Sequence, residues 1–320
     1  MSGALYPVEF LDRFGTEFAP WTLEDSLAYT RALARAHYEN FQVVSFLLPR
    51  RLHQDFYNVY SFCRWADDLG DEIGDRARSI ELLAWWRENL EKTFAGDGAG
   101  HPVFVALRTS IARHSLEEKP FADLIRAFVQ DQTKTRFATW EELIDYCAYS
   151  ANPVGRLVLD LCGFSDEERR RLSDATCTAL QLANFWQDVR RDWKKGRVYL
   201  PQDVMLRHGY STEALAEDLA SGRCREEFRP MMAELCDRTE ALFVQGLPLV
   251  DTVDARLAVD LDLFSRGGLT VLELIRRQDY DVISHRPKVG KAARMLLLIQ
   301  ALRRRLFTPR RATEAKTQYG

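Results

Sequence analysis

Helical periodicity runs through almost the whole chain and limits its fold more than any other feature. No stretch alternates apolar and polar residues for long enough to form a pair of strands. Thr139–Glu142 and Ser165–Glu168 predict helix starts, because a hydroxyl and a glutamate three residues later can satisfy free backbone donors. The breaks are short and none resembles a linker, so 320 residues are expected to form one all-α domain. The predicted helices cover about 22–37, 51–73, 79–94, 102–114, 120–132, 140–162, 166–194, 212–220, 225–246, 252–279 and 289–306.

Composition narrows the classes of function. A net charge of −3 gives no reason to expect a nucleic-acid partner. The six cysteines form no CxxC pair, which fits a reducing, cytoplasmic setting. The first residues, "MSGALYPVEFLDRFG", lack the basic start and apolar core of a signal peptide. The late apolar run "MLLLIQAL" is far shorter than the ~20 residues that span a bilayer.

An acidic segment, "CRWADDLGDEIGD" (63–75), follows a strongly apolar and aromatic run. On a helix, Tyr60, Arg64, Asp67 and Asp71 fall within an arc of about 60°. The preceding turns are apolar nearly all round, which is typical of a buried helix. Its acidic end is therefore expected to open on an interior cavity, although a solvated helix end remains the alternative.

A second segment, "QLANFWQDVRRDWKKGRVYLP" (181–201), repeats this arrangement. Gln181, Asn184, Asp188 and Asp192 share one helix face within about 80°. Aspartates four residues apart repel and destabilise an isolated helix by a few tenths of a kcal/mol. Two such pairs in a mostly apolar chain suggest a shared ligand that carries positive charge.

Carboxylates at this spacing suit Mg²⁺, a hard ion that keeps some of its waters and often bridges to a phosphate. Zinc is disfavoured, because the histidines are scattered and no HExxH occurs. A phosphate bound through Mg²⁺ also requires positively charged side chains. The alternative for a cluster of such side chains is an ordinary solvated surface. The candidate cations are Arg64, Arg197, Lys288, Lys291 and Arg294.

Four segments now point to a family: "HYENF", "YSFCRWADDLGDE", "YCAYSANPVG" and "NFWQDVRRDWKKGRVYLP". In order and approximate spacing they resemble the all-trans head-to-head prenyl synthases, which include squalene and phytoene synthases. The similarity covers residues from about 30 to 290. It implies a single isoprenoid-synthase helical domain over residues 1–320, with a central cavity.

The resemblance also implies roles for individual residues. Mg²⁺ and the diphosphate would be held by Asp67, Asp71, Asn184, Asp188 and Asp192, and the four aspartates would act in catalysis with Tyr146 and Asn152. The substrate would contact His37, Phe41, Tyr60, Arg64, Gln181, Asn184, Arg197, Tyr199, Tyr280 and Lys288.

Within the family, "HYENF", "SANPVGRLVL" and "NFWQDV" most resemble the hydroxysqualene synthases of bacterial hopanoid biosynthesis. Those enzymes convert presqualene diphosphate and water to hydroxysqualene and diphosphate. Gln187 stands where squalene synthases usually have arginine, which removes one expected diphosphate contact. The resemblance leaves open presqualene diphosphate, squalene or phytoene synthase activity. It also leaves open a non-catalytic protein that binds prenyl diphosphates or acts as an assembly scaffold.

Asn152 and Pro153 replace a small Ala-Gly-like pair of squalene synthases. Proline cannot donate to the carbonyl of Tyr149, which leaves an acceptor free in an expected cavity wall. Asn152 and that carbonyl could hold the attacking water, since an ordered water needs two to four polar partners. The alternative is that Asn152 only relieves the kink.

The expected reaction passes through a carbocation, which aromatic faces stabilise without trapping it. Each candidate could equally belong to an ordinary core. The candidates are Phe41, Tyr60, Phe62, Tyr146 and Phe185.

The basic, apolar segment 291–307 predicts either an interfacial helix at the inner membrane face or a core-packing last helix with a basic end. Partner enzymes of the same pathway are a further expectation.

Overall fold

The computed structural model describes residues 5–36, 49–98 and 100–290, and within them the regular elements are helices. In chain order these are α1 (Pro7–Phe14), α2 (Leu23–Ala36), the 3-10 helix η1 (Arg50–Leu52), α4 (His53–Asp71), α5 (Arg76–Ala95), α6 (Pro102–His114), α7 (Glu118–Asp131), α8 (Trp140–Ser150), α9 (Asn152–Leu161), α10 (Glu167–Lys194), α11 (Gln202–Arg207), α12 (Thr212–Ser221), α13 (Phe228–Gly246), the 3-10 helix η2 (Leu247–Asp251) and α14 (Ala255–Arg277). The predicted all-α class is confirmed, but α1 and α11 were not predicted, because each is too short to show a clear apolar period.

The predicted helix 140–162 is divided, which corrects its single span. Ala151 has φ −121° and separates α8 from α9, so Pro153 falls in the first turn of a new helix. A missing N–H is tolerated there, because those donors have no partner within the helix. The predicted start at Thr139 is confirmed by its bond from the Glu142 N–H at 3.2 Å. At the next helix the prediction was wrong, since Asp166 rather than Ser165 caps α10.

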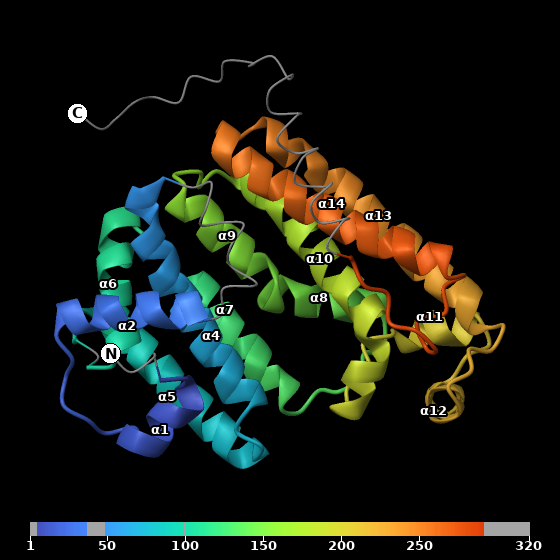
Figure 1. Ribbon diagram of the computed structural model, residues 1–320, viewed down its shortest axis with the longest axis horizontal. Helices are drawn as coiled ribbons and strands as arrows, with labels where there is room; N and C mark the ends of the chain where they lie inside the picture. The colour runs from blue at the N-terminus through green and yellow to red at the C-terminus, as the bar shows by residue number, and fades with distance from the viewer. Residues whose placement is uncertain (1–4, 37–48, 99, 291–320) are drawn as a thin grey trace.

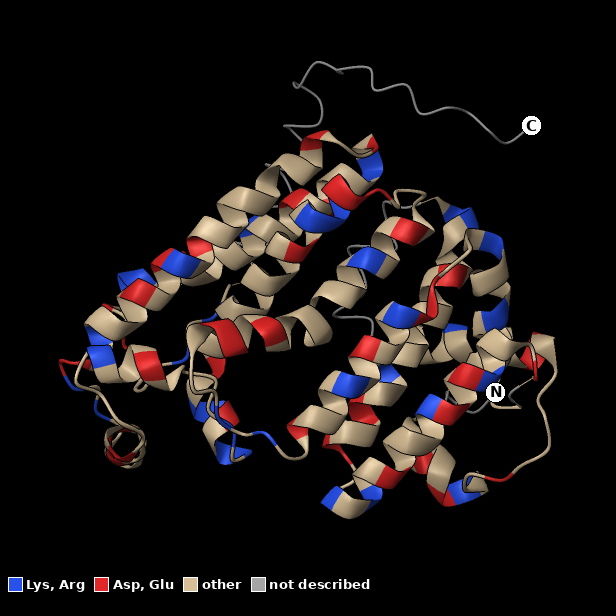
Figure 2. Ribbon diagram, turned by 180° about the vertical axis from the view of Figure 1, so that it is seen from behind, with Lys and Arg blue, Asp and Glu red and all other residues tan. Residues whose placement is uncertain are grey.

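The described helices enclose two large buried cores and one small cluster formed by Leu159, Leu172, Leu249 and Leu257. The N-terminal core lies mainly between α1, α2 and α4–α7, and the C-terminal core mainly between α8 and α10–α14. Figure 1 shows these groups on opposite sides of the molecule, with α8 and α9 between them. Charged residues of both signs are interspersed over the helices of both groups (Figure 2). The two aspartate stripes lie on helices of different cores, α4 and α10.

Helix α10 packs against α8, α9, α13 and α14. Glycines on two neighbours permit this close approach. A Cβ on Gly246 of α13 would lie 2.1 Å from Oγ1 of Thr176, and one on Gly155 of α9 would lie 2.5 Å from Sγ of Cys177. The N-terminal half of α10 is therefore packed closely against α9 and α13.

The segment after α10 crosses to the loop between α7 and α8. The N–H of Val198 donates to the carbonyl of Thr135 at 2.9 Å, and that of Gln202 donates to Phe137 at 3.0 Å. These bonds place Arg197 and Tyr199 between the two cores. In the part of the chain that the structure describes, no helix is both long and apolar enough to cross a membrane. The basic segment 291–307 lies outside the described residues. The predicted helix 289–306 also lies outside them, except for its first two residues.

Candidate active site

The first aspartate stripe lies on the last two turns of α4. Arg64 contacts Asp67 at 3.5 Å and also bonds to the neighbouring Asp68. The Asp67 side chain is 46% exposed, whereas that of Asp71 is 19% exposed. Burial raises the pKa of Asp67 despite the charge of Arg64. The stripe therefore runs from an open carboxylate to an enclosed one.

Asp71 joins the two halves of the molecule. Its two carboxylate oxygens accept hydrogen bonds from Lys195 and Arg197, each at 2.8 Å, across more than 120 positions of sequence. Burial alone would raise the pKa of Asp71, but these two bonds outweigh it and lower the pKa below its ordinary value. The end of α4 is thus bound directly to the segment that follows the second stripe.

The second stripe lies on α10, which departs from helical geometry at Asp188 (φ −108°, ψ 15°). Asp188 accepts two hydrogen bonds from Arg286, at 2.6 and 2.8 Å. Asn184 is exposed and Gln181 is half-buried on the same face. Burial, followed by the charge of Asp188, raises the pKa of Asp192 to about 7. Asp188 is therefore paired with an arginine, whereas Asp192 is a half-buried carboxylate beside a second carboxylate.

Arg286 belongs to a loop after α14. The sequence analysis did not assign this arginine to the site. Gln187 accepts from Arg286 at 3.0 Å and donates to the carbonyl of Pro287 at 2.8 Å. Arg190 donates to the carbonyl of Ile283 at 2.8 and 3.0 Å. This loop therefore fastens over the kink in α10. The basic character of this loop was the only sequence signal for Arg286, and the sequence analysis assigned Lys288 of the same loop to the site instead.

An aromatic group lies behind Arg197. The rings of Phe185 and Tyr199 stack with centroids 3.7 Å apart, and Phe137 stacks on Tyr199 at 5.6 Å. Tyr146 lies 5.9 Å from Tyr199 and donates its hydroxyl hydrogen to Asp131 at 2.9 Å. Burial, then the charge of Asp131, raises the pKa of Tyr146 well above its ordinary value.

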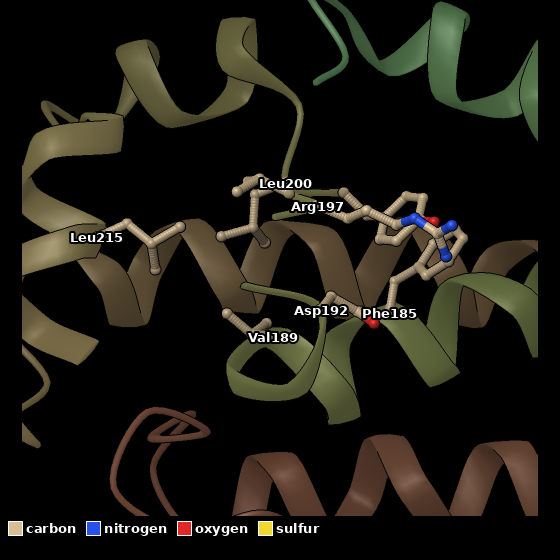
Figure 3. Close-up of a pocket in the computed structure, with 8 residues that line it drawn as sticks. Phe185, Val189, Asp192, Arg197, Leu200 and Leu215 are labelled. Carbon is tan, nitrogen blue, oxygen red and sulfur yellow. The ribbon is translucent and has the colours of Figure 1, made fainter. Parts of the chain in front are cut away.

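A small pocket, in which about 10 Å³ is open to the centre of a water-sized sphere, adjoins this group. Figure 3 shows Asp192, Arg197 and Phe185 toward one end and Val189, Leu200 and Leu215 toward the other. The pocket thus joins charged groups to an apolar wall. A cavity long enough for two prenyl tails stays a prediction.

Other predicted residues lie in different surroundings. Tyr60 is half-buried on the face of α4 that carries the stripe. Tyr280 has a positive φ of 60° and packs against the C-terminal core, while Lys288 is exposed. Phe62 is fully buried among Trp86 and other rings of the N-terminal core, so the ordinary-core alternative applies to it. His37, Phe41, Lys291 and Arg294 lie outside the described residues.

Asn152 is buried and ties α9 to α10. Its side-chain oxygen accepts the hydroxyl hydrogen of Thr178 at 2.9 Å. This contact packs α9 against α10, and both predicted roles of Asn152 stay predictions.

The donor set fits Mg²⁺ in chemistry, since carboxylate oxygens are the ligands that this hard ion prefers. Among the described residues, however, no three His, Cys, Asp or Glu side chains are already arranged to hold a metal ion. Asp71 and Asp188 are instead paired with Arg197 and Arg286. Direct metal binding would require these arginines to give up their carboxylates.

Comparison with known proteins decides the family. A model described as squalene/phytoene synthase matches residues 34–293. The chain belongs to the squalene/phytoene synthase family. Hydroxysqualene synthases from Rhodopseudomonas palustris and Zymomonas mobilis are 34% and 32% identical to it, covering 75% and 84% of this chain and 80% and 89% of theirs. A phytoene synthase from Thermus thermophilus is 29% identical over 91% of this chain and 97% of its own.

Solved structures of this enzyme family share the fold. The squalene synthase HpnC from Alicyclobacillus acidocaldarius is 46% identical, with a TM-score of 0.74 over 81% of this chain and 95% of that one. A dehydrosqualene synthase in complex with a ligand has a TM-score of 0.77 at 24% identity, over 88% and 96% of the two chains. The predicted isoprenoid-synthase fold is thereby confirmed.

Proposed function

We propose that this enzyme is a hydroxysqualene synthase of squalene and hopanoid biosynthesis. It would convert presqualene diphosphate and water to hydroxysqualene and diphosphate, with Mg²⁺ as cofactor. The observation that carries the reaction class is the junction of the two aspartate stripes through Asp71, Lys195 and Arg197. The choice of product rests on the similarity to enzymes named hydroxysqualene synthase.

The first chemical task is departure of the diphosphate from carbon. Bound Mg²⁺ would stabilise the negative charge that develops on the departing oxygens. Arg64, Arg197 and Arg286 supply further positive charge, and each can exchange a carboxylate partner for a phosphate oxygen with the same donors. Such preorganised cations stabilise the transition state at the point where charge develops.

The second task is to hold the carbocation until one nucleophile reaches it. The stacked rings of Phe185 and Tyr199 lie beside Asp192 and Arg197 in the same pocket. An aromatic face stabilises a cation by about 0.5–2 kcal/mol without forming an adduct. Leu200 and Leu215 continue the wall with apolar surface, which restricts entry of bulk water.

Squalene formation is the second candidate. It is favoured by the 46% identity to a structure titled squalene synthase. That reaction would replace water by hydride, so the two candidates differ in their need for a reduced nicotinamide.

The test uses pure protein with Mg²⁺ and presqualene diphosphate in ¹⁸O-water, with and without NADPH. We expect ¹⁸O-labelled hydroxysqualene in both conditions, because water supplies the oxygen. Excess EDTA should abolish turnover and added Mg²⁺ should restore it. Squalene formed only with NADPH would support the second candidate, and full activity in EDTA would exclude a metal requirement.

A further inference from the structure

Asp131 is the last residue of α7. Among the described residues, only one of its two carboxylate oxygens has a hydrogen-bond partner. One oxygen accepts the hydrogen of Tyr146, and the residue is 8% exposed. The other oxygen is buried and has no hydrogen-bond partner among the described residues. Leaving such a group unsatisfied costs about 1–3 kcal/mol, more when it is charged.

A second buried pair shows how a structural tyrosine–aspartate contact is built. Tyr210 donates to Asp218 at 3.0 Å, and Asp218 is 3% exposed. Arg225 bonds to both oxygens of Asp218, through its side chain at 2.8 Å and its backbone N–H at 3.3 Å. That carboxylate is fully satisfied and its charge is neutralised. Asp131 has the same tyrosine contact, but no arginine of the described residues bonds to it.

The hydrogen bond to Asp131 also determines which hydrogen-bonding role the Tyr146 hydroxyl has toward other groups. A phenol has one hydrogen, so a hydroxyl that donates to Asp131 presents only acceptor lone pairs elsewhere. The ring of Tyr199 lies beside that of Tyr146, with centroids 5.9 Å apart. Tyr199 itself lines the pocket beside Asp192 and Arg197. Polar groups therefore connect the pocket to the buried carboxylate.

We infer that Asp131 is the end point of a proton relay, through Tyr199 and Tyr146, that takes up the proton released when water captures the carbocation. This inference rests on the proposed function, because hydride capture releases no such proton.

The step balances without an oxidant or reductant. A lone pair of the water oxygen forms the new C–O bond and gives a protonated alcohol. The excess proton passes to the Tyr199 oxygen as the hydrogen of Tyr199 moves to Tyr146 and that of Tyr146 moves to Asp131. Both tyrosines end neutral, Asp131 ends as a carboxylic acid, and its proton later returns by the reverse path to released diphosphate or solvent.

The surroundings of Asp131 suit a proton acceptor near neutral pH. Burial raises its pKa to about 6, although the charge of Arg197 and the bond from Tyr146 act in the opposite direction. A general base is most effective when its pKa lies near the working pH. The charged and titratable groups that face it are Asp67 and Asp71 from α4, Tyr146 from α8, and Arg197 with Tyr199 from the segment after α10.

The test compares Asp131→Asn with the wild type by measuring ¹⁸O-hydroxysqualene and released diphosphate separately. Asparagine keeps the size and can still accept the Tyr146 hydrogen, but it cannot take up the proton. General-base catalysis typically contributes at least ~100-fold, so we expect about that loss in alcohol formation with KM changed less than ~3-fold. The rise of the wild-type rate across pH ~6 should be absent from the variant.

Two further variants separate the relay from a structural role. Tyr146→Phe should lower alcohol formation by a similar factor, and the double variant should be no worse than the poorer single variant, because both act in one path. Asp218→Asn is the matched control: it should lower the melting temperature and leave the pH profile unchanged. Circular dichroism and melting curves verify that each variant is folded.

The outcomes separate the two hypotheses. A wild-type protein that makes only hydrocarbon overturns both. Labelled alcohol from the wild type, with a normal rate and pH profile in Asp131→Asn, overturns the relay and leaves the proposed function intact. Losses that multiply in the double variant also overturn it, since independent sites would then be responsible.

Discussion

The two aspartate stripes share one spacing but are neutralised in different ways. On α4, Asp71 is bound by Lys195 and Arg197, which follow the other stripe directly in sequence. On α10, Asp188 is bound by Arg286 from a loop 98 positions later. The first contact joins the two cores, whereas the second fastens a loop to its own core. We call the contact of Asp71 with Lys195 and Arg197 the bridge, and the contact of Asp188 with Arg286 the latch.

The difference extends to the helices themselves. α4 keeps regular geometry through its stripe, and Gln132 bonds to the carbonyl of Gly70 at 2.9 Å near the end of the helix. α10 is distorted at Asp188, where Gln187 and Arg286 support the kink. The first stripe is positioned by the regular end of α4, and the second by the bend in α10. We expect substitutions to affect the two in different proportions.

The largest expected effect is on catalysis and should be similar for both stripes. Asp67→Asn and Asp188→Asn should each lower turnover at least ~100-fold, a loss of about 2.7 kcal/mol in transition-state stabilisation, with the fold retained. Steady-state kinetics with presqualene diphosphate checks this, and melting curves serve as the control. Near-normal activity in either variant would show that its stripe does not serve the metal and diphosphate.

A smaller effect should separate the bridge from the latch. Arg197→Gln is expected to lower the free energy of unfolding by about 2 kcal/mol, because a hydrogen bond to a charged group contributes roughly 1.5–3 kcal/mol. Arg286→Gln should cost about half as much, since the Arg286 side chain is 28% exposed against 15% for Arg197. Urea unfolding measures both. Equal losses would remove the distinction between the two contacts.

The smallest effect concerns the glutamines that support each stripe. Gln132 is buried, so Gln132→Leu leaves the Gly70 carbonyl unsatisfied and should cost about 1–2 kcal/mol of stability. Gln187 is half-buried, and Gln187→Leu should cost less than about 1 kcal/mol because water can replace its contacts. Thermal melts at one pH compare the two variants. A larger loss at Gln187 would mean that the kink depends on the loop more than α4 depends on Gln132.

Asp131 and Arg286 show why part of the site was missed from the sequence. Neither lies at a regular distance from an aspartate stripe, and "FVQDQTKT" reads as the ordinary end of a helix. Asp131 becomes informative only because Tyr146, 15 positions later, bonds to it, and because its second oxygen has no partner within the described part of the chain. Periodicity describes one helix at a time and contains no record of such contacts.

The sequence by itself determined the helical class, the two aspartate stripes and the family, because a 3.6-residue period and a fixed side-chain spacing are local properties. It also indicated Arg64 and Arg197 as candidate cations for a phosphate, and Tyr146 through the family resemblance. Only the tertiary structure decided that Lys195 and Arg197 bridge to Asp71, that Arg286 covers Asp188, and that Asn152 bonds to Thr178. These partners are 26 to 126 positions apart. The pairing of Asp71 with Lys195 and Arg197 depends on how two separately packed cores place the end of α4 beside the segment after α10.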